Sequence, residues 1–347
     1  MDQQKIVNEV QPALVDLEQQ RQKHLERLEK GTIYYGIATF LMFLTFLSTI
    51  LIAKWCLLLG IVSVILVLVL RSFAIGDPFN DYKEEYKNNI IKRVVKMINP
   101  TVVYRPRKVV FKFTLEKSRI LGKVNDFRGE DFFKGQTTKG YPFQFSEIHL
   151  MGEHSASLLY FKGLFFVMKN PVEMKGQILI FPKKINDPLD WIAPISSNKN
   201  QPPKIKYNPL QIANQPLEFK QKYVAYSNNH KEAVQVLTTA FLETIVELSE
   251  QWKTAFRIAF IEDKIYLALP STVNYFEDKM YLEATHQFIV TGLYKELTKS
   301  LNVLEQVGTA LEAVPKLKIE LNKEKPKITQ SNNWEDSAYN HFIDDEF

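Results

Sequence analysis

The stretch "IAKWCLLLG" (residues 52–60) places one lysine, Lys54, inside an otherwise uncharged apolar run. A bilayer core of about 30 Å needs roughly 20 helical residues, and the apolar segment 33–75 is about twice as long as one crossing requires. We therefore expect two membrane crossings, with Lys54 and Trp55 forming a tight turn at the far membrane face. The predicted transmembrane helices are 33–53 and 55–75.

Basic residues flank this segment on the sides that lead to the two chain termini. Lys and Arg concentrate in cytoplasmic loops, and the predicted turn offers only Lys54. The flanking basic residues are Arg21, Lys23, Arg27, Lys30, Arg71, Lys83, Lys87, Lys92 and Arg93. The sequence therefore predicts an integral membrane protein with both termini in the cytoplasm; the alternative is a buried helical hairpin in a soluble protein.

The overall composition is that of a chain with a sizeable core and little net charge. The 347 residues are 46% hydrophobic. They include 44 basic and 39 acidic side chains, which gives a net charge of +5. This balance gives no case for nucleic-acid binding. The single cysteine, Cys56, excludes an internal disulfide and a cysteine-based zinc site.

Helical patterns precede and follow the apolar segment. In 1–30, apolar residues recur at three- and four-residue steps, which predicts an amphipathic helix or a short coiled-coil seam. The segment 77–100 is predicted to hold a charged juxtamembrane helix that ends at Asn99 and Pro100. Its basic residues face either solvent or anionic lipid.

The segment 101–315 is predicted to be a cytosolic α+β domain with a mainly antiparallel sheet, because alternating apolar residues recur in short runs separated by Gly, Pro and Asn. A proline-rich stretch, 185–216, reads as a long surface loop. The amphipathic pattern at 231–252 predicts one helix, with Asn228 or Asn229 as its cap. The predicted strands include 108–116, 141–150, 157–169, 176–183 and a hairpin that turns near Glu262 and Asp263.

The C-terminal part offers two candidate surfaces for a protein partner. The helix expected at 282–314 has leucines near heptad spacing, so it is expected to pair with the N-terminal helix or with another copy of the chain, as a homo-oligomer. The segment 316–347 is expected to be a disordered acidic tail that carries aromatic residues, which favours a docking motif over a purely solubilising tail. The docking candidates are Trp334, Tyr339, Phe342 and Phe347.

The segment "YRPRKVVFKFTLEKSRILGKVNDFRGEDFFKGQTTKGYPFQFSEIHL" (residues 104–150) resembles the bacterial domain of unknown function 3137 family. The family's motif falls on Tyr104 and Pro106, on Arg128 to Asp131, and on Phe145 to Glu147. With a later "FKGLFF", the resemblance covers roughly 104–276. It implies a two-span hairpin ahead of a cytosolic domain at the bacterial inner membrane, and it implies no activity.

Two groups of polar residues are weak candidates for catalysis. Glu130 and Asp131 are adjacent, and neighbours on a strand face opposite sides, so a structural role is favoured. Glu147 and His149 share one strand face through their two-residue spacing, which suits proton transfer or a metal, although a half-solvated polar face is the simpler reading.

No phosphate-binding, dinucleotide, nucleophile or metalloprotease motif is present in the sequence, so no metal and no cofactor are expected. We therefore expect a non-catalytic, membrane-anchored scaffold that tethers a protein partner at the inner membrane face. The alternatives are an uncharacterised membrane-bound enzyme that uses the carboxylates and His149, and a sensor of anionic lipid surfaces.

Overall fold

The computed structural model describes residues 3–51, 56–71, 77–122, 124, 126–151, 161–185, 207–277, 280–285, 287–312 and 314. All of them belong to one compact unit of the chain. The predicted turn residues Lys54 and Trp55, the predicted tail 316–347 and most of the predicted loop 185–216 lie outside these ranges.

The N-terminal and first apolar segments form one helix, α1 (Gln3–Leu51), and not two separate elements. Nothing between residues 30 and 33 breaks it, since Gly31 and Thr32 are both accommodated within the helix. Its first half is amphipathic as predicted, and this half contacts the helices after residue 77 and the last helix of the chain. The residues buried on that face include Ile6, Val10, Ala13, Leu14 and Leu17.

The second half of α1 is long and apolar enough to cross a membrane. Only 11% of its most apolar 18-residue window is buried within the chain, which is unlike the core helix of a soluble protein. Among the described residues it is the one helix that meets this criterion. The helix α2 (Cys56–Arg71) lies beside α1, with Thr45 Oγ1 3.3 Å from Ser63 Oγ, but its 16 residues are fewer than one crossing needs. The second crossing therefore stays a proposal.

The helix predicted at 77–100 is present, with a change of helical pitch in its middle. The helix α3 (Asp77–Tyr86) continues into a π-helix (Lys87–Ile91) and then into α4 (Lys92–Ile98), which ends at Asn99 as expected. A π-turn holds an extra residue, and it buries Lys87 together with Ile90 and Ile91.

The described strands form one nine-stranded sheet in the order β1-β2-β3-β4-β9-β8-β5-β7-β6, in which every neighbouring pair is antiparallel. The predicted fold class, α+β with a mainly antiparallel sheet, is confirmed. The strands are β1 (Val103–Arg105), β2 (Asp126–Gln136), β3 (Pro142–Met151), β4 (Phe161–Lys169), β5 (Ile178–Pro182), β6 (Asn208–Pro209), β7 (Tyr223–Ser227), β8 (Arg257–Ile261) and β9 (Lys264–Pro270).

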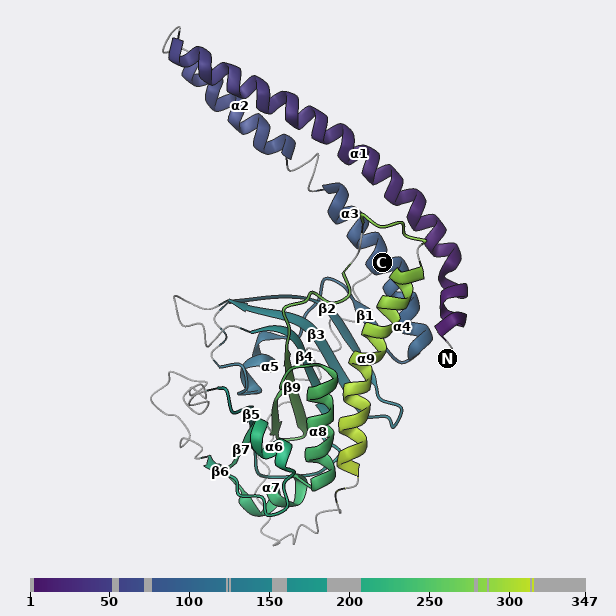
Figure 1. Cartoon of the computed structure of the whole chain (residues 1–347), viewed down its shortest axis with the longest axis vertical. Coiled ribbons are helices and arrows are strands. Elements are labelled where there is room, and N and C mark those ends of the chain that lie inside the picture. Colours follow the sequence, from purple (N-terminus) through teal and green to yellow (C-terminus); the bar gives the residue numbers. More distant parts are fainter. Residues whose placement is uncertain are drawn as a thin grey trace, which may run out of the picture. The chain divides into compact units, whose positions relative to one another are not determined.

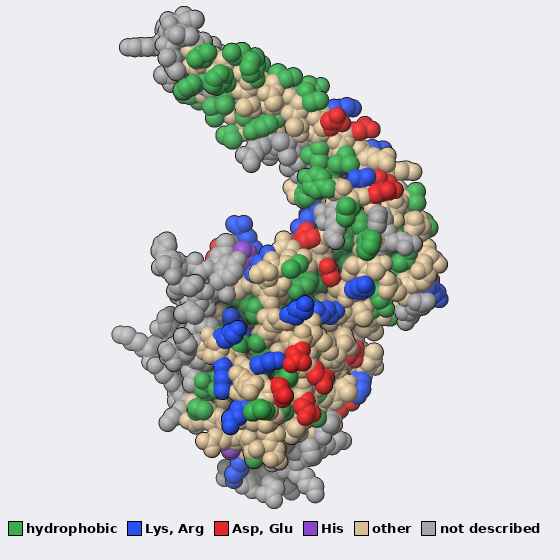
Figure 2. Space-filling view, viewed as in Figure 1, with side chains coloured by type: hydrophobic (Ala, Val, Ile, Leu, Met, Phe, Trp, Pro, Cys, Tyr) green, Lys and Arg blue, Asp and Glu red, His purple; other side chains and the backbone are tan. Residues whose placement is uncertain are grey.

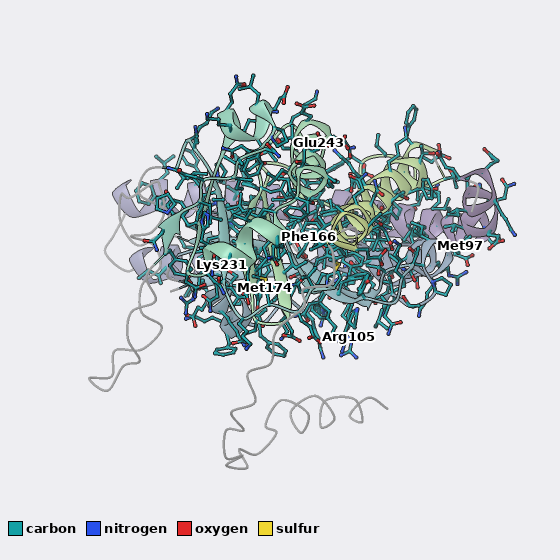
Figure 3. The ribbon with its side chains drawn as sticks, turned by 90° about the horizontal axis from the view of Figure 1, so that it is seen from below. Met97, Arg105, Phe166, Met174, Lys231 and Glu243 are labelled. Carbon is teal, nitrogen blue, oxygen red and sulfur yellow. The ribbon has the colours of Figure 1, made fainter. Side chains whose placement is uncertain are left out.

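Helices cover one face of this sheet, and an irregular segment with one short helix covers the other (Figure 1). Against the first face, Phe241 packs edge-on against Phe260 with ring centroids 5.6 Å apart, and Phe166 lies in the interior (Figure 3). The short helix on the second face is α5 (Lys112–Lys117); the other helices of this region are α6 (Leu217–Lys222), α7 (His230–Val236), α8 (Thr239–Gln251) and α9 (Gln287–Glu312).

The strand predicted at 108–116 is wrong. The segment ends in the helix α5, and the alternating residues Phe111 and Phe113 are 68% and 59% exposed, whereas Val110 and Leu115 are fully buried. The buried positions are five residues apart, so alternation misidentified which side chains point inward.

The helix predicted at 231–252 is in fact two helices, because Leu237 leaves the helical conformation (φ −82°, ψ 62°) and Thr238 caps α8. The predicted cap at Asn229 is confirmed, since its side chain accepts a hydrogen bond from the Glu232 amide. The hairpin at residues 262–263 is confirmed too.

The predicted last helix begins later than expected, at Gln287, and contacts α1 as well as α8 and α4. Its heptad leucines are buried within the chain.

Candidate functional site

The centre of the candidate site is a buried ion pair between the π-helix and β2. The Lys87 ammonium donates hydrogen bonds to both carboxylate oxygens of Asp131, at 2.8 and 2.7 Å. The Lys87 side chain is 3% exposed, and that of Asp131 is fully buried. The Tyr104 hydroxyl, on β1, also donates to Asp131. A buried charge needs partners of this kind, because an unpaired one costs several kcal/mol.

A β-bulge, and not regular strand geometry, brings Glu130 into the same cluster. Glu130 lies opposite Glu147 on β3 and Phe133 lies opposite Phe145, so two residues of β2 face one residue of β3 in between. Asp131, inside the bulge, has a positive φ of 59°. Lys87 Nζ lies 2.9 Å from Glu130 Oε2 as well. The expectation that these adjacent carboxylates face opposite sides is therefore wrong.

The amide of Asp131 donates to the carbonyl of Pro106 at 2.9 Å, which fixes the bulge against the chain that follows β1. Gly129 permits this close packing, because a Cβ there would lie 2.5 Å from a methyl carbon of Val109 and 2.6 Å from the Glu147 carbonyl oxygen. The sequence "RGED" thus supplies a small residue where β2 packs closely against Val109 and β3, and two carboxylates that accept hydrogen bonds from Lys87.

Two further residues extend the cluster toward its more exposed side. Lys83, one helical turn before Lys87, lies 3.1 Å from Glu130 and 3.2 Å from Glu277. The carboxylates of Glu130, Asp131 and Glu277 lie within 4.8 Å of one another, a spacing that suits a divalent cation. The Lys83 and Lys87 ammonium groups already bond these three carboxylates and offset most of their charge, so the residues present do not fit a metal ion.

The cluster shifts the pKa of each carboxylate according to its surroundings. Burial raises the pKa of Asp131 to about 7, although Lys87 and Tyr104 both act to lower it. For Glu130, burial also acts to raise the pKa, but the two ammonium groups outweigh it and lower the pKa below its ordinary value. The cluster thus holds Glu130 as the charged partner of both lysines.

Glu147 lies next to this cluster without a cationic partner in it. Burial raises its pKa to about 7; the Tyr275 amide, which donates to Glu147 Oε2 at 2.8 Å, lowers it, and the charges of Asp131 and Glu130 raise it. His149 shares the face of Glu147 on β3, as predicted, but lies across from Arg128 and outside the group of carboxylates. The structure thus brings Glu130, Asp131 and Glu147 together and leaves His149 further along the strand.

The residues that sequence reasoning missed are Lys83, Lys87, Tyr104 and Glu277. The family motif carried a signal for one of them, because its Tyr-x-Pro part contains Tyr104 and Pro106, which both form hydrogen bonds with Asp131. In the sequence, Lys83 and Lys87 stand out only as basic residues that flank the apolar segment. No local pattern marks them, since their partners lie more than 40 residues away.

Comparison with known proteins places the second half of the domain in a family. No curated protein matches the chain. Among solved structures, the crystal structure of the mycobacterial trehalose monomycolate transport factor A, TtfA, is similar at 12% sequence identity and a TM-score of 0.35, over 65% of this chain and 95% of that chain. Residues 159–309 match the family model described as "Protein of unknown function (DUF3137)". The quoted motif at 104–150 lies ahead of the matched segment. The match over residues 159–309, from the start of the central strands to α9, supports the resemblance to the DUF3137 family that the sequence indicated.

Proposed function

We propose that the protein is a membrane-anchored binding module that holds a protein partner at the cytoplasmic face of the bacterial inner membrane. The observation that carries this proposal is the continuity of α1. One helix packs against the domain through Leu14 and Leu17 and then exposes apolar residues such as Phe43, which is 59% exposed. A domain joined to the bilayer in this way keeps its partner within a small volume and raises the partner's local concentration.

The Lys87 cluster supports the same proposal. It attaches the helical segment 77–98 to the sheet through a buried ion pair. The domain thus holds both α1, through its packed first half, and the helical segment 77–98, through Lys87. A tether built like this sets the distance and orientation of a partner as well as its concentration.

The alternative of an enzyme at the carboxylates has less support. Asp131 is fully buried and Glu147 is 7% exposed, and each already accepts a hydrogen bond from the chain itself. A general acid or base must reach the proton that it transfers. These two groups are better suited to holding β2, β3 and the π-helix together.

The first test is capture of partners by crosslinking in native membranes, followed by extraction at alkaline pH. The full chain is compared with a chain truncated after Lys327, and with a chain that carries Trp334→Ala and Phe342→Ala. The proposal expects the full chain to remain in the membrane pellet and to capture a partner that both tail variants lose. Recovery of identical proteins by all three baits contradicts tail docking, and release into the supernatant contradicts the anchor.

The second test concerns orientation. Protease is added to right-side-out vesicles that contain the full chain, and the C-terminus is detected with an antibody. Both termini are proposed to be cytoplasmic, so the tail is expected to survive until detergent is added. Cleavage of the tail in intact vesicles contradicts this orientation.

A further inference from the structure

The outer edge of β2 is paired along only part of its length. The strand β1 lies opposite residues 132–134, and the Asp131 amide donates to the carbonyl of Pro106 just before them. Along residues 126–130, the strands that the structure describes pair with β2 only on its inner side, where β3 lies. An unpaired strand edge presents backbone N–H and C=O groups that a strand of another chain can bond.

The segment that follows β1 does not continue along this edge. The Lys108 amide donates to the carbonyl of Arg105 at 3.3 Å, so the chain turns directly after β1. Two residues later, the Val110 amide donates to Ser146 Oγ at 3.0 Å. Ser146 belongs to β3, on the inner side of β2, so the segment has crossed onto the face of the sheet. It therefore does not pair with the edge at residues 126–130.

The side chains at this edge carry opposite charges. Asp126, Arg128 and Gly129 are exposed, whereas Phe127 is half-buried against the core on the second face of the sheet. Because side chains alternate along a strand, Asp126 and Arg128 share the face opposite to Phe127. Within the described part of the chain, neither of these two charged side chains forms an ion pair. The edge thus presents one acidic and one basic side chain for a partner to pair.

The order of these charges makes the edge complementary to itself. When two copies of one strand pair antiparallel around a twofold axis, one residue lies opposite itself and its neighbours lie opposite each other. With Phe127 on the axis, Asp126 of each copy lies opposite Arg128 of the other, and the two phenylalanine rings meet. Opposite charges and aromatic pairs across neighbouring strands stabilise a sheet.

Other registers of the same pairing are less favourable. With Arg128 on the axis, two guanidinium groups lie opposite each other, and Asp126 lies opposite Glu130. With Gly129 on the axis, Arg128 lies opposite Glu130, but Glu130 already bonds both Lys83 and Lys87. The charges therefore select the register centred on Phe127.

The rest of the surface favours a contact through matched charges. Figure 2 shows hydrophobic side chains gathered along α1 and α2, whereas side chains of both charges are interspersed over the domain. Two domains that meet therefore depend on complementary charges and strand pairing, and residues 126–128 offer both.

We infer that two copies of the chain associate through β2, with residues 126–128 of each copy paired antiparallel around Phe127 to join the two sheets into one. The inference goes beyond the proposed function and does not depend on it. The partner is a second copy and not a strand of a different protein, because the charges of this edge complement themselves under a twofold axis.

The test is a charge exchange in the full chain, purified in detergent. Sedimentation velocity over a range of micromolar concentrations gives the dissociation constant of the dimer. Asp126→Arg and Arg128→Asp each place like charges opposite one another, and the double variant restores opposite charges. As a matched control, Lys231→Asp reverses an exposed charge on α7, which follows β7 near the other edge of the sheet (Figure 3).

The inference expects wild type and Lys231→Asp to dimerise equally, and each single edge variant to weaken the dimer by about tenfold or more. The double variant is expected to return to within about threefold of wild type. A wild-type chain that stays monomeric throughout the range overturns the inference. So does a dimer that both single variants form as tightly as wild type, because another surface then holds it. A double variant as weak as the single ones overturns the register centred on Phe127.

Discussion

Lys87 and Asp131 form a bidentate hydrogen-bonded ion pair, 2.8 and 2.7 Å long, that joins a π-helix to a β-bulge across 44 residues of sequence. Both partners depart from regular secondary structure at the place where they meet. A regular α-helix or an unbroken strand would place these side chains differently, so the ion pair forms where both irregularities occur. This pair attaches the juxtamembrane helix to the sheet.

Loss of Lys87 is expected to be far more damaging than loss of Lys83. Lys87→Met leaves the Asp131 carboxylate buried without its cation and is expected to lower the free energy of unfolding by about 3–5 kcal/mol. Lys83→Met removes a side chain that is 25% exposed, with partly exposed partners, and is expected to cost at most about 1 kcal/mol. Urea unfolding of the detergent-solubilised chain, followed by tryptophan fluorescence, measures both. Equal midpoints for the two variants would contradict the proposed role of Lys87.

Replacing both partners is expected to cost less than the two single changes together. Lys87→Met and Asp131→Asn each leave a buried group without its partner, whereas the double variant leaves no buried charge at this pair. The coupling free energy is expected to be about 1–3 kcal/mol in the favourable direction. The same urea experiment, carried out as a double-mutant cycle, gives this value. Additive effects within about 0.5 kcal/mol would mean that the pair does not act as a unit.

Stability is expected to fall as pH rises through the neutral range because of Glu147. Its pKa is about 7 in the folded chain and about 4 in the unfolded chain, so between these values the folded state binds the additional proton. The stabilisation from Glu147 is therefore complete below about pH 4 and is lost as pH rises through 7, by about 3–4 kcal/mol. The Gln side chain in Glu147→Gln keeps an acceptor for the Tyr275 amide but does not titrate.

The measurement is the free energy of unfolding of wild type and Glu147→Gln at pH 5, 6, 7 and 8. The difference between the two proteins, which cancels the titrating groups that do not interact with Glu147, is expected to change with pH in the direction given above. A difference that stays constant over this range would show that Glu147 titrates well below pH 5.

Two glycines are expected to respond to alanine in opposite directions. At Gly163 in β4, φ is +144° and a Cβ would lie 2.0 Å from the Leu269 carbonyl oxygen, so Gly163→Ala is expected to cost about 3 kcal/mol or more. At Gly292 in α9, no atom lies within 4 Å of the added Cβ, so Gly292→Ala is expected to stabilise the chain by about 0.5–1 kcal/mol. Thermal unfolding of the two variants checks both signs. A tolerated Gly163→Ala would contradict the close approach of β4 and β9.

Much of this architecture could be predicted because it depends on neighbouring residues. The apolar half of α1, the hairpin at residues 262–263 and the cap at Asn229 each follow from a pattern within a few positions. The same logic failed at 108–116, where alternation suggested a strand. There the buried side chains, Val110 and Leu115, are selected by the sheet face onto which the segment packs, and a local period does not contain that information.

At the candidate site, too, some features follow from the local sequence and others only from tertiary packing. The sequence by itself determined that Glu147 lies on a strand-forming segment, that Glu130 and Asp131 form a distinctive polar pair, and that an apolar helix precedes all three. Only the tertiary structure decided that a bulge turns Asp131 toward Lys87, that Tyr104 bonds it, and that Glu147 is buried opposite Glu130. The physical reason is that burial and charge pairing are set by segments far apart along the chain. A buried carboxylate and an exposed one have the same letter in the sequence, and they differ only in what folds against them.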